Sequence, residues 1–371
     1  MACSDARNPV ADASPDTDAD TDTDADTDTD TDSDVDTDTG EPDWGDTTPC
    51  ANAPGEDEVC IPGGKYLLGC VPGDTECEDN EKPLVLVELS PFFIDRYEAQ
   101  LDEVIEFLNY TKDLPGYQLY PCGIRDPEGN QFWVMVHYTT DAPGGMCPVV
   151  QNTSGDYEYN PDVENDLIEG SCWQLGGIEA VAGGFSWTAA KMFCEWKGMQ
   201  LPTEAQWEAA ARGQTLNEHP CGTDPWECQW GMYDCYGACS MYYDDSVGLC
   251  CYPYSPDIAG VGCLSPFGVN GMYGNAGEWT ADYHDTDHGW ADGLTDPLQS
   301  DEEANPYGSH VGKGGSVDAS SSSVRISARS GSSSLSDNGF PTVGVRCVRP
   351  DEPLPQTDAG TPDAGADAGK K

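Results

Sequence analysis

Several features common in other protein classes are missing from this 371-residue sequence. No run of about 18 consecutive apolar residues occurs, which argues against a transmembrane helix. Basic residues are few, with 16 Lys and Arg against 68 Asp and Glu, and they form no patch suited to nucleic acid. The sequence also has no GxSxG, P-loop or GxGxxG motif. Nucleophilic hydrolysis and nucleotide use therefore have no support.

Cysteine is abundant, yet one long stretch has none. The chain has 17 cysteines, but none lies between Cys263 and Cys347. A reducing cytosol rarely tolerates so many thiols unless they hold metal, and their wide spacing argues against one compact zinc cluster. We therefore expect an oxidising compartment. Setting Cys3 aside leaves an even number of cysteines, which is compatible with complete disulfide pairing.

Residues 1–49 are expected to form a disordered acidic spacer. Asp occupies every even position from Asp16 to Asp38, and such a run has repelling charges and nothing apolar to bury. Weak calcium chelation by these carboxylates is the alternative, although the run has no Gly turns of the kind that calcium loops use. Residues 351–371 form a second low-complexity segment. One large domain remains, over residues 50–350.

The tripeptide Met1-Ala2-Cys3 resembles the end of a bacterial lipobox, in which a small residue precedes the lipidated cysteine. Cys3 is therefore the expected lipid anchor, with a stray N-terminal cysteine as the alternative. This interpretation predicts a protein of the bacterial cell envelope. It would be anchored at the outer membrane or cell surface, or lie in the periplasm, and would contact the membrane through the lipid only.

Hydrophobic spacing and capping residues predict three helices. Apolar residues recur at i, i+3, i+4 and i+7 over Leu101–Leu108. Ser186 can cap a second helix that runs to residue 197, and a Thr203–Gln206 capping box can start a third that ends before Gly213. The aromatic side chains of the last two helices are expected in the core: Trp187, Phe193, Trp196 and Trp207.

Five segments carry recognisable longer motifs. In chain order they are CIPGGKYLLGC (60–70), LSPFFIDRYEAQLDEVIEFL (89–108), GFSWTAAKMFCEWKGMQLPTEAQWEAAARG (184–213), SPFGVNGMYGNAGEWTADYH (265–284) and KGGSVDASSSSVRISARSGSSSLSDNGFPTVGVRCVR (313–349). From about Cys60 to Pro350 the chain thus resembles the formylglycine-generating enzyme family, the sulfatase-modifying factors. The resemblance implies an α+β, loop-rich fold related to C-type lectin domains, here rich in disulfides.

The enzymes of this family oxidise a substrate cysteine to an aldehyde with molecular oxygen and a copper(I) ion held by two cysteines. The resemblance places those two positions at Ala319 and Val324, or the second at Ser321 when it is counted back from Arg329. Soft thiolates select copper(I), whereas a serine hydroxyl stays protonated and is a hard, poor ligand. The sequence therefore argues against copper and predicts no catalytic residues. Rescue by a distant cysteine is the alternative.

Other positions of the family's substrate groove are retained. The resemblance matches Trp279 and Ser316 to groove residues near the copper and Arg329 to a motif arginine. Asp318 and the serines of Ser320–Ser323 are expected to line the same surface. Retention of a groove without its metal fits a binding module, but these residues could equally serve only the turns and packing of the fold.

The resemblance also implies structural calcium in the segment GMYGNAGEWT. Its acidic ligand matches Glu278, and its carbonyl ligands match Tyr273, Gly274 and Ala276. Hard oxygen donors in a tight loop suit calcium and do not need the missing thiols. Gly277 replaces the first Trp of the family's WEW motif, which could loosen the loop. A second family calcium site has no assignable residues here.

Two expectations concern cysteines. The resemblance implies a disulfide between Cys194 and Cys347, and it places the family's other bridge at Ala211 and Ile326, which cannot form one. Residues 221–263 hold seven further cysteines without a repeated CxxC spacing, so this insertion is read as disulfide-stapled, with zinc as the alternative. Four aromatic residues of the insertion could contact a partner or pack beneath it: Trp226, Trp230, Tyr242 and Tyr243.

The sequence thus predicts a non-catalytic recognition protein of the cell surface or periplasm, with a protein or glycan ligand at the groove or the insertion. An oxygen-dependent oxidoreductase of the formylglycine-generating type is the first alternative. A purely structural envelope lipoprotein is the second. No oligomeric state and no nucleic-acid partner is predicted.

Overall fold

The computed structural model describes most of the predicted domain. The described residues are 42–120, 123–134, 149–160, 173–175, 183–222, 243–244, 249–250, 252–254, 264–284, 290–300, 308–316, 319–330 and 343–351. The chain divides into two compact units, residues 1–43 and 44–371, and every described helix and strand lies in the second. Within the described ranges no helix has the length and apolar content needed to cross a bilayer.

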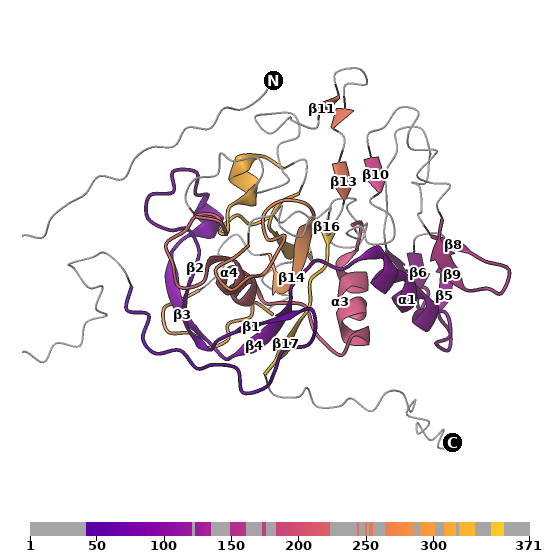
Figure 1. The fold of residues 1–371 in the computed structure, drawn as a ribbon, viewed down its shortest axis with the longest axis horizontal. Helices are drawn as coiled ribbons and strands as arrows, with labels where there is room; N and C mark the ends of the chain where they lie inside the picture. Colours follow the sequence, from indigo (N-terminus) through magenta and orange to yellow (C-terminus); the bar gives the residue numbers. More distant parts are fainter. Residues whose placement is uncertain are drawn as a thin grey trace, which may run out of the picture. The chain divides into compact units, whose positions relative to one another are not determined.

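The second unit is an α+β arrangement of short helices and several small sheets (Figure 1). Its described α-helices are α1 (Leu101–Thr111), α3 (Trp187–Trp196) and α4 (Glu204–Arg212), and its 3-10 helices are η1 (Asp79–Glu81) and η4 (Ser321–Val324). Its longer described strands are β1 (Glu58–Ile61), β2 (Gly64–Leu68), β3 (Val85–Leu89), β4 (Phe92–Asp95), β14 (Gly277–Tyr283) and β15 (His310–Lys313). The shorter ones are β5 (Gln118–Tyr120), β6 (Gly123–Arg125), β7 (Gln131–Trp133), β8 (Val149–Gln151), β9 (Tyr157–Tyr159), β10 (Trp173–Leu175), β11 (Tyr243–Asp244), β12 (Leu249–Cys250), β13 (Tyr252–Tyr254), β16 (Val343–Gly344) and β17 (Val348–Pro350).

The capping residues start the helices where the sequence predicts. Ser186 Oγ accepts a hydrogen bond from the backbone N–H of Ala189 at 3.3 Å, which begins α3. At α4, Thr203 Oγ1 accepts from the Gln206 N–H at 3.1 Å and the Gln206 side chain accepts from the Thr203 N–H at 2.9 Å. Each reciprocal bond satisfies a backbone donor that the first turn leaves without a partner. Gly213 ends α4 with a φ of 62°, a conformation that favours glycine.

Two of the three described three-stranded sheets position the rest of the domain. In the first, β4 lies between β1 and β17 and is antiparallel to both, so segments from the two ends of the domain share one sheet. In the second, β14 is antiparallel to β15 and parallel to β16. The hairpin of β2 and β3 packs against α4 (Figure 1).

The core has two main clusters of buried apolar side chains. One surrounds α1 and α3 and includes Phe107, Phe185 and Phe193, whose rings meet edge to face. The other lies between α4 and the sheet strands β1 to β4 and includes Trp207. Phe193 and Trp207 are fully buried as predicted. The remaining two expected core residues are only partly buried and pack at the edge of the first cluster: Trp187 and Trp196.

Three described disulfides tie the domain together: Cys50–Cys60, Cys70–Cys77 and Cys194–Cys347. The last of them joins α3 to the residue before β17, the connection that the family resemblance implies. The family's other bridge positions, Ala211 and Ile326, both lie in the second core cluster with no exposed surface. Most of the insertion at residues 221–263 lies outside the described residues, so its expected staples and aromatic contacts stay predictions.

We expect the Cys194–Cys347 bridge to stabilise the domain more than the Cys50–Cys60 bridge. The first closes a sequence separation of 153 residues and the second one of 10, and the loop-entropy model gives about 5 and about 3 kcal/mol for these lengths. The matched double variants C194A/C347A and C50A/C60A should therefore differ in their urea unfolding free energies. An equal loss in both variants would contradict the prediction.

Candidate functional site

The segment that matches the family's reaction centre begins where β15 ends. Gly314 and Gly315 turn the chain with φ angles of 84° and 68°. A Cβ on Gly314 would lie 3.1 Å from the Trp207 ring, and one on Gly315 would lie 2.6 Å from Val324 Cγ1. Glycine is therefore needed at the second position by close approach as well as by conformation.

The turn brings the two expected copper positions together. The same hypothetical Cβ on Gly315 would lie 2.6 Å from Val324 Cγ1 and 3.2 Å from Ala319 Cβ. Val324 is fully buried, and Ala319 packs with it and with Tyr273 in a small apolar cluster. Both expected copper positions are therefore occupied by alkyl side chains. The geometry favours Val324 over Ser321 as the second position, because Val324 points into the cluster.

The serines of η4 lie at the outer edge of this cluster. Ser320 and Ser323 are exposed. The Ser320 hydroxyl bonds with those of Ser322 and Ser323 at 2.7 and 3.0 Å. Among the expected groove residues, Ser316 is half-buried and Asp318 lies outside the described residues. An exposed row of hydroxyl groups is therefore the polar surface that the segment offers.

Two of the expected groove residues lie inside the protein. Trp279 has no exposed surface, and its indole N–H donates to the Phe185 carbonyl at 2.9 Å. Arg329 is 8% exposed. Its guanidinium donates to Glu204 at 2.9 Å and to the Asn80 carbonyl at 3.0 Å. In this conformation both side chains support the fold and neither reaches a ligand at the surface.

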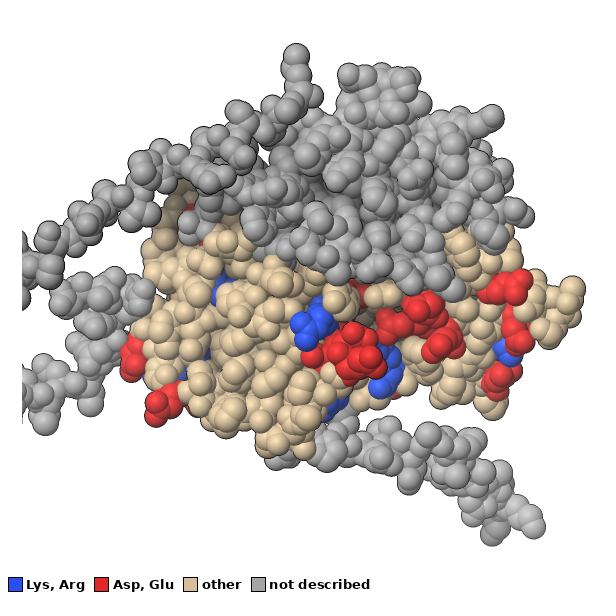
Figure 2. Space-filling view, in the orientation of Figure 1, with Lys and Arg blue, Asp and Glu red and all other residues tan. Residues whose placement is uncertain are grey.

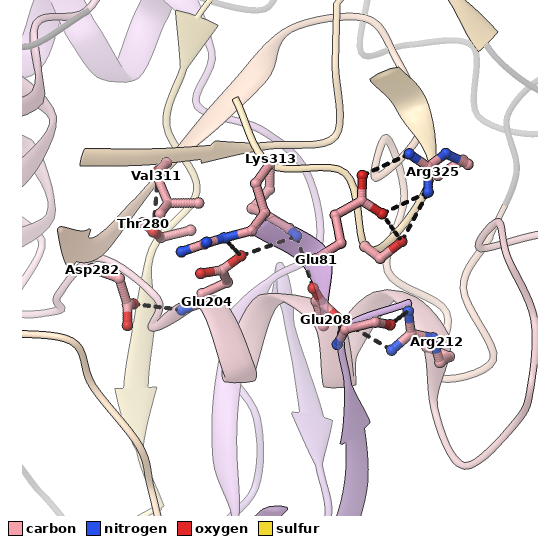
Figure 3. A network of polar contacts seen from close by, with 12 residues as sticks. Glu81, Glu204, Glu208, Arg212, Thr280, Asp282, Val311, Lys313 and Arg325 are labelled. Carbon is pink, nitrogen blue, oxygen red and sulfur yellow. Dashed lines mark hydrogen bonds and ion pairs between the residues drawn. The ribbon is translucent and has the colours of Figure 1, made fainter. Parts of the chain in front are cut away.

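A network of buried side-chain ion pairs supports the segment from inside the protein (Figure 3). Lys313 at the end of β15 donates to Glu208 at 2.8 Å and to Glu204 at 3.3 Å, and all three side chains are fully buried. Arg212 pairs with Glu208 at 2.9 Å and also donates to the carbonyls of Leu67 and Gly69. The network links α4, β15 and the end of β2. Sequence reasoning missed it, although Glu208 and Arg212 have the i, i+4 spacing of a helical ion pair.

Asp282 on β14 lies at one edge of this network, next to Glu204. Its carboxylate accepts from the backbone N–H of Glu204 at 2.7 Å and of Gln299 at 2.8 Å (Figure 3). Complete burial, together with the nearby Glu204 carboxylate, raises the pKa of Asp282 to about 7. The two backbone hydrogen bonds and Arg329 oppose this rise in pKa without cancelling it.

The expected calcium ligand Glu278 is bound by other groups. Arg346 donates to both carboxylate oxygens at 2.6 to 3.0 Å, and Trp207 donates to Oε2 at 2.6 Å. The Glu98 carboxylate lies nearby and accepts from Asn275 at 2.6 Å; burial and the charge of Glu278 raise its pKa to about 8. A guanidinium therefore pairs with Glu278 in this structure, and calcium binding through that carboxylate stays a prediction. The carbonyl ligands expected at Tyr273, Gly274 and Ala276 stay a prediction.

These positions can now be compared with known proteins. The profile of the family described as the sulfatase-modifying factor enzyme 1-like domain matches residues 45–351. The chain belongs to this family. The formylglycine-generating enzyme of Thermomonospora curvata is 28% identical over 312 residues, which cover 78% of this chain and 92% of that protein. The formylglycine-generating enzyme of Mycobacterium tuberculosis is 26% identical over 316 residues, covering 78% of this chain and 96% of that protein.

The solved structure of PvdO from Pseudomonas aeruginosa has the same fold. Its TM-score is 0.52 with 19% sequence identity, and the match covers 82% of this chain and 99% of that chain. The sulfatase-modifying factor fold therefore spans the described core, including the Gly314–Gly315 turn and the strands beneath it. At the two positions where the resemblance expects copper ligands, this chain carries Ala319 and Val324.

We expect the Asp282→Asn variant to change how stability depends on pH. The pKa of Asp282 is raised in the folded state, so its carboxyl stabilises the fold fully below the unfolded value, near 4, and this contribution is lost as the pH rises to about 7. Relative to the original chain, D282N should gain unfolding free energy between pH 4 and pH 7. Urea titrations at several pH values measure the difference, and parallel stability curves would contradict it.

Proposed function

We propose that this chain is a non-catalytic recognition protein that uses the sulfatase-modifying factor fold to bind a protein or glycan partner. The observation that carries the proposal is the apolar cluster of Ala319, Val324 and Tyr273. It stands where the family resemblance expects two thiolates. Methyl groups cannot coordinate copper(I), and the neighbouring serine hydroxyls are hard, neutral donors.

Burial strengthens this argument. Val324 is fully buried under the turn at Gly315, with 2.6 Å between its Cγ1 and the place of a Cβ on that glycine. The Val324 side chain is therefore packed closely against the backbone at Gly315. The cysteine that follows this segment, Cys347, is paired with Cys194 in a disulfide.

The proposed binding surface is the outer edge of the same segment. The hydroxyl groups of Ser320 and Ser323 are exposed, and hydroxyl rows can exchange hydrogen bonds with sugar hydroxyls or peptide groups. The expected relation to C-type lectin domains would suit such a scaffold. Figure 2 shows acidic side chains in clusters on one face, with single basic ones among them and no basic patch on the part of that face that the structure describes.

The cellular setting completes the proposal. Described disulfides support an oxidising compartment, and Cys3 is the proposed lipid anchor at the end of the acidic spacer. Copper-dependent oxidation is the competing function, because the curated relatives are named formylglycine-generating enzymes.

We expect the original chain to lack a two-thiolate copper(I) site and the variant A319C/V324C to gain one. The reason is that the Ala319 and Val324 side chains both lie beside Gly315 and belong to one small cluster. Anaerobic competition against a copper(I) chelator measures the affinity for copper(I). The matched control is A319C/S321C, which places the second thiol at the alternative position, Ser321. Aldehyde formation on a cysteine peptide, with oxygen uptake by the original chain, would overturn the non-catalytic proposal.

We also expect a soluble form of the domain to bind members of a glycan or peptide array. The variant S320A/S323A should lose most of this binding because it removes the exposed hydroxyl groups, while S154A, on the distant β8–β9 hairpin, should keep it. Unfolding curves of the three proteins establish that each is folded. Absence of binding by the original chain would favour a purely structural envelope protein.

A further inference from the structure

A cluster of metal-binding side chains lies outside the site described above. The loop between β2 and the end of η1 brings together Cys70, Asp74, Cys77 and Glu81, and one ligand atom from each lies within 4.8 Å of all the others. The loop is held closed by hydrogen bonds from the Cys70 N–H to the Glu81 carbonyl at 3.0 Å and from the Asp74 N–H to the carbonyl of Val71 at 3.3 Å. Cys70 and Glu81 are buried, and the other two are partly buried.

Arg325 supplies the positive charge in this cluster. Its guanidinium donates to both oxygens of Glu81 at 2.7 Å (Figure 3). It also donates to Asp74 at 2.7 Å. The side chains of these three residues are at most 3% exposed. Two carboxylates against one guanidinium leave the cluster with an excess negative charge even when the cysteines form their disulfide. Buried charge of this kind attracts a cation strongly.

We propose that Cys70, Cys77 and Asp74 bind a borderline-soft divalent cation such as Zn²⁺ when the disulfide between the two cysteines is reduced. Glu81, held by Arg325, either completes the site or orients it from outside. The cluster thus has two states, a disulfide state without metal and a dithiolate state with metal. This inference is independent of the proposed recognition function.

The chemistry balances with one co-reactant, a dithiol reductant. Thiol–disulfide exchange breaks the Cys70–Cys77 bond, the reductant becomes a cyclic disulfide, and the two electrons and two protons it gives up leave two protein thiols. Metal binding then releases the two thiol protons to solvent. The two new thiolates add two negative charges to the cluster, and the divalent cation restores the original balance. Sulfur with carboxylate oxygen is a donor set that suits Zn²⁺.

Cobalt(II) titration of the full chain tests the proposal, because a cobalt–thiolate bond gives a charge-transfer absorption that carboxylates alone do not. The chain is first treated with a dithiol, and mass spectrometry after alkylation reports which cysteine pairs are reduced. The double variant C70S/C77S removes the proposed thiolates, and C50S/C60S removes another described pair as the matched control. D74N removes the carboxylate ligand and leaves both sulfurs.

We expect the reduced chain and the C50S/C60S variant to bind the same amount of cobalt, and C70S/C77S to lose one equivalent with its thiolate absorption. D74N keeps both thiolates, and its affinity for cobalt should be at least about tenfold weaker than that of the original chain. Loss of even a side chain that only contacts a metal ligand typically weakens metal affinity about 10–100-fold. Equal cobalt binding and absorption in C70S/C77S and the original chain would overturn the proposal. So would an unchanged affinity in D74N, which remains informative if the double serine variant fails to fold.

Discussion

The buried charges on α4 fix the position of everything around the candidate site. Lys313 lies between Glu204 and Glu208 with no access to water, and Arg329 contacts the same Glu204. Removing one partner of such a buried pair typically costs about 3–5 kcal/mol, because it leaves an uncompensated charge. The segment from β15 to η4 is therefore anchored by buried ion pairs within the protein.

The ion pairs are separate from the two positions where the resemblance expects copper thiolates. Ala319 and Val324 belong to an apolar cluster, whereas the charged pairs join other side chains. Ala211 and Ile326, where the resemblance expects the family's other bridge, also lie in an apolar cluster. At all four positions the side chains contribute van der Waals packing to the fold.

The sequence predicted the local structure well because its signals are local. The caps at Ser186 and Thr203 lie within one helical turn of the donors they satisfy, so α3 and α4 begin where expected. The sequence did not predict how deeply the side chains of its motifs are buried. Trp279 and Arg329 belong to recognisable motifs, yet a motif does not state that the indole is bonded to Phe185 or that the guanidinium is paired with Glu204.

Contacts between distant segments were the part that the sequence could not supply. Arg325 meets Asp74 and Glu81 across a separation of more than two hundred residues, and nothing in either segment's composition indicates the other. The closeness of Ala319 and Val324 to one another beside the turn at Gly315 is likewise a three-dimensional contact that the sequence does not state.

The closure of the domain has a mechanical consequence. The Asp351 carboxylate accepts from the Ala51 N–H at 2.6 Å, and β1, β4 and β17 place both boundaries of the domain in one sheet beside the Cys50–Cys60 bridge. Tension transmitted through the flanking segments would enter and leave the domain at neighbouring points. Such a pull would load that three-stranded sheet directly, at the place where the Cys50–Cys60 bridge reinforces it.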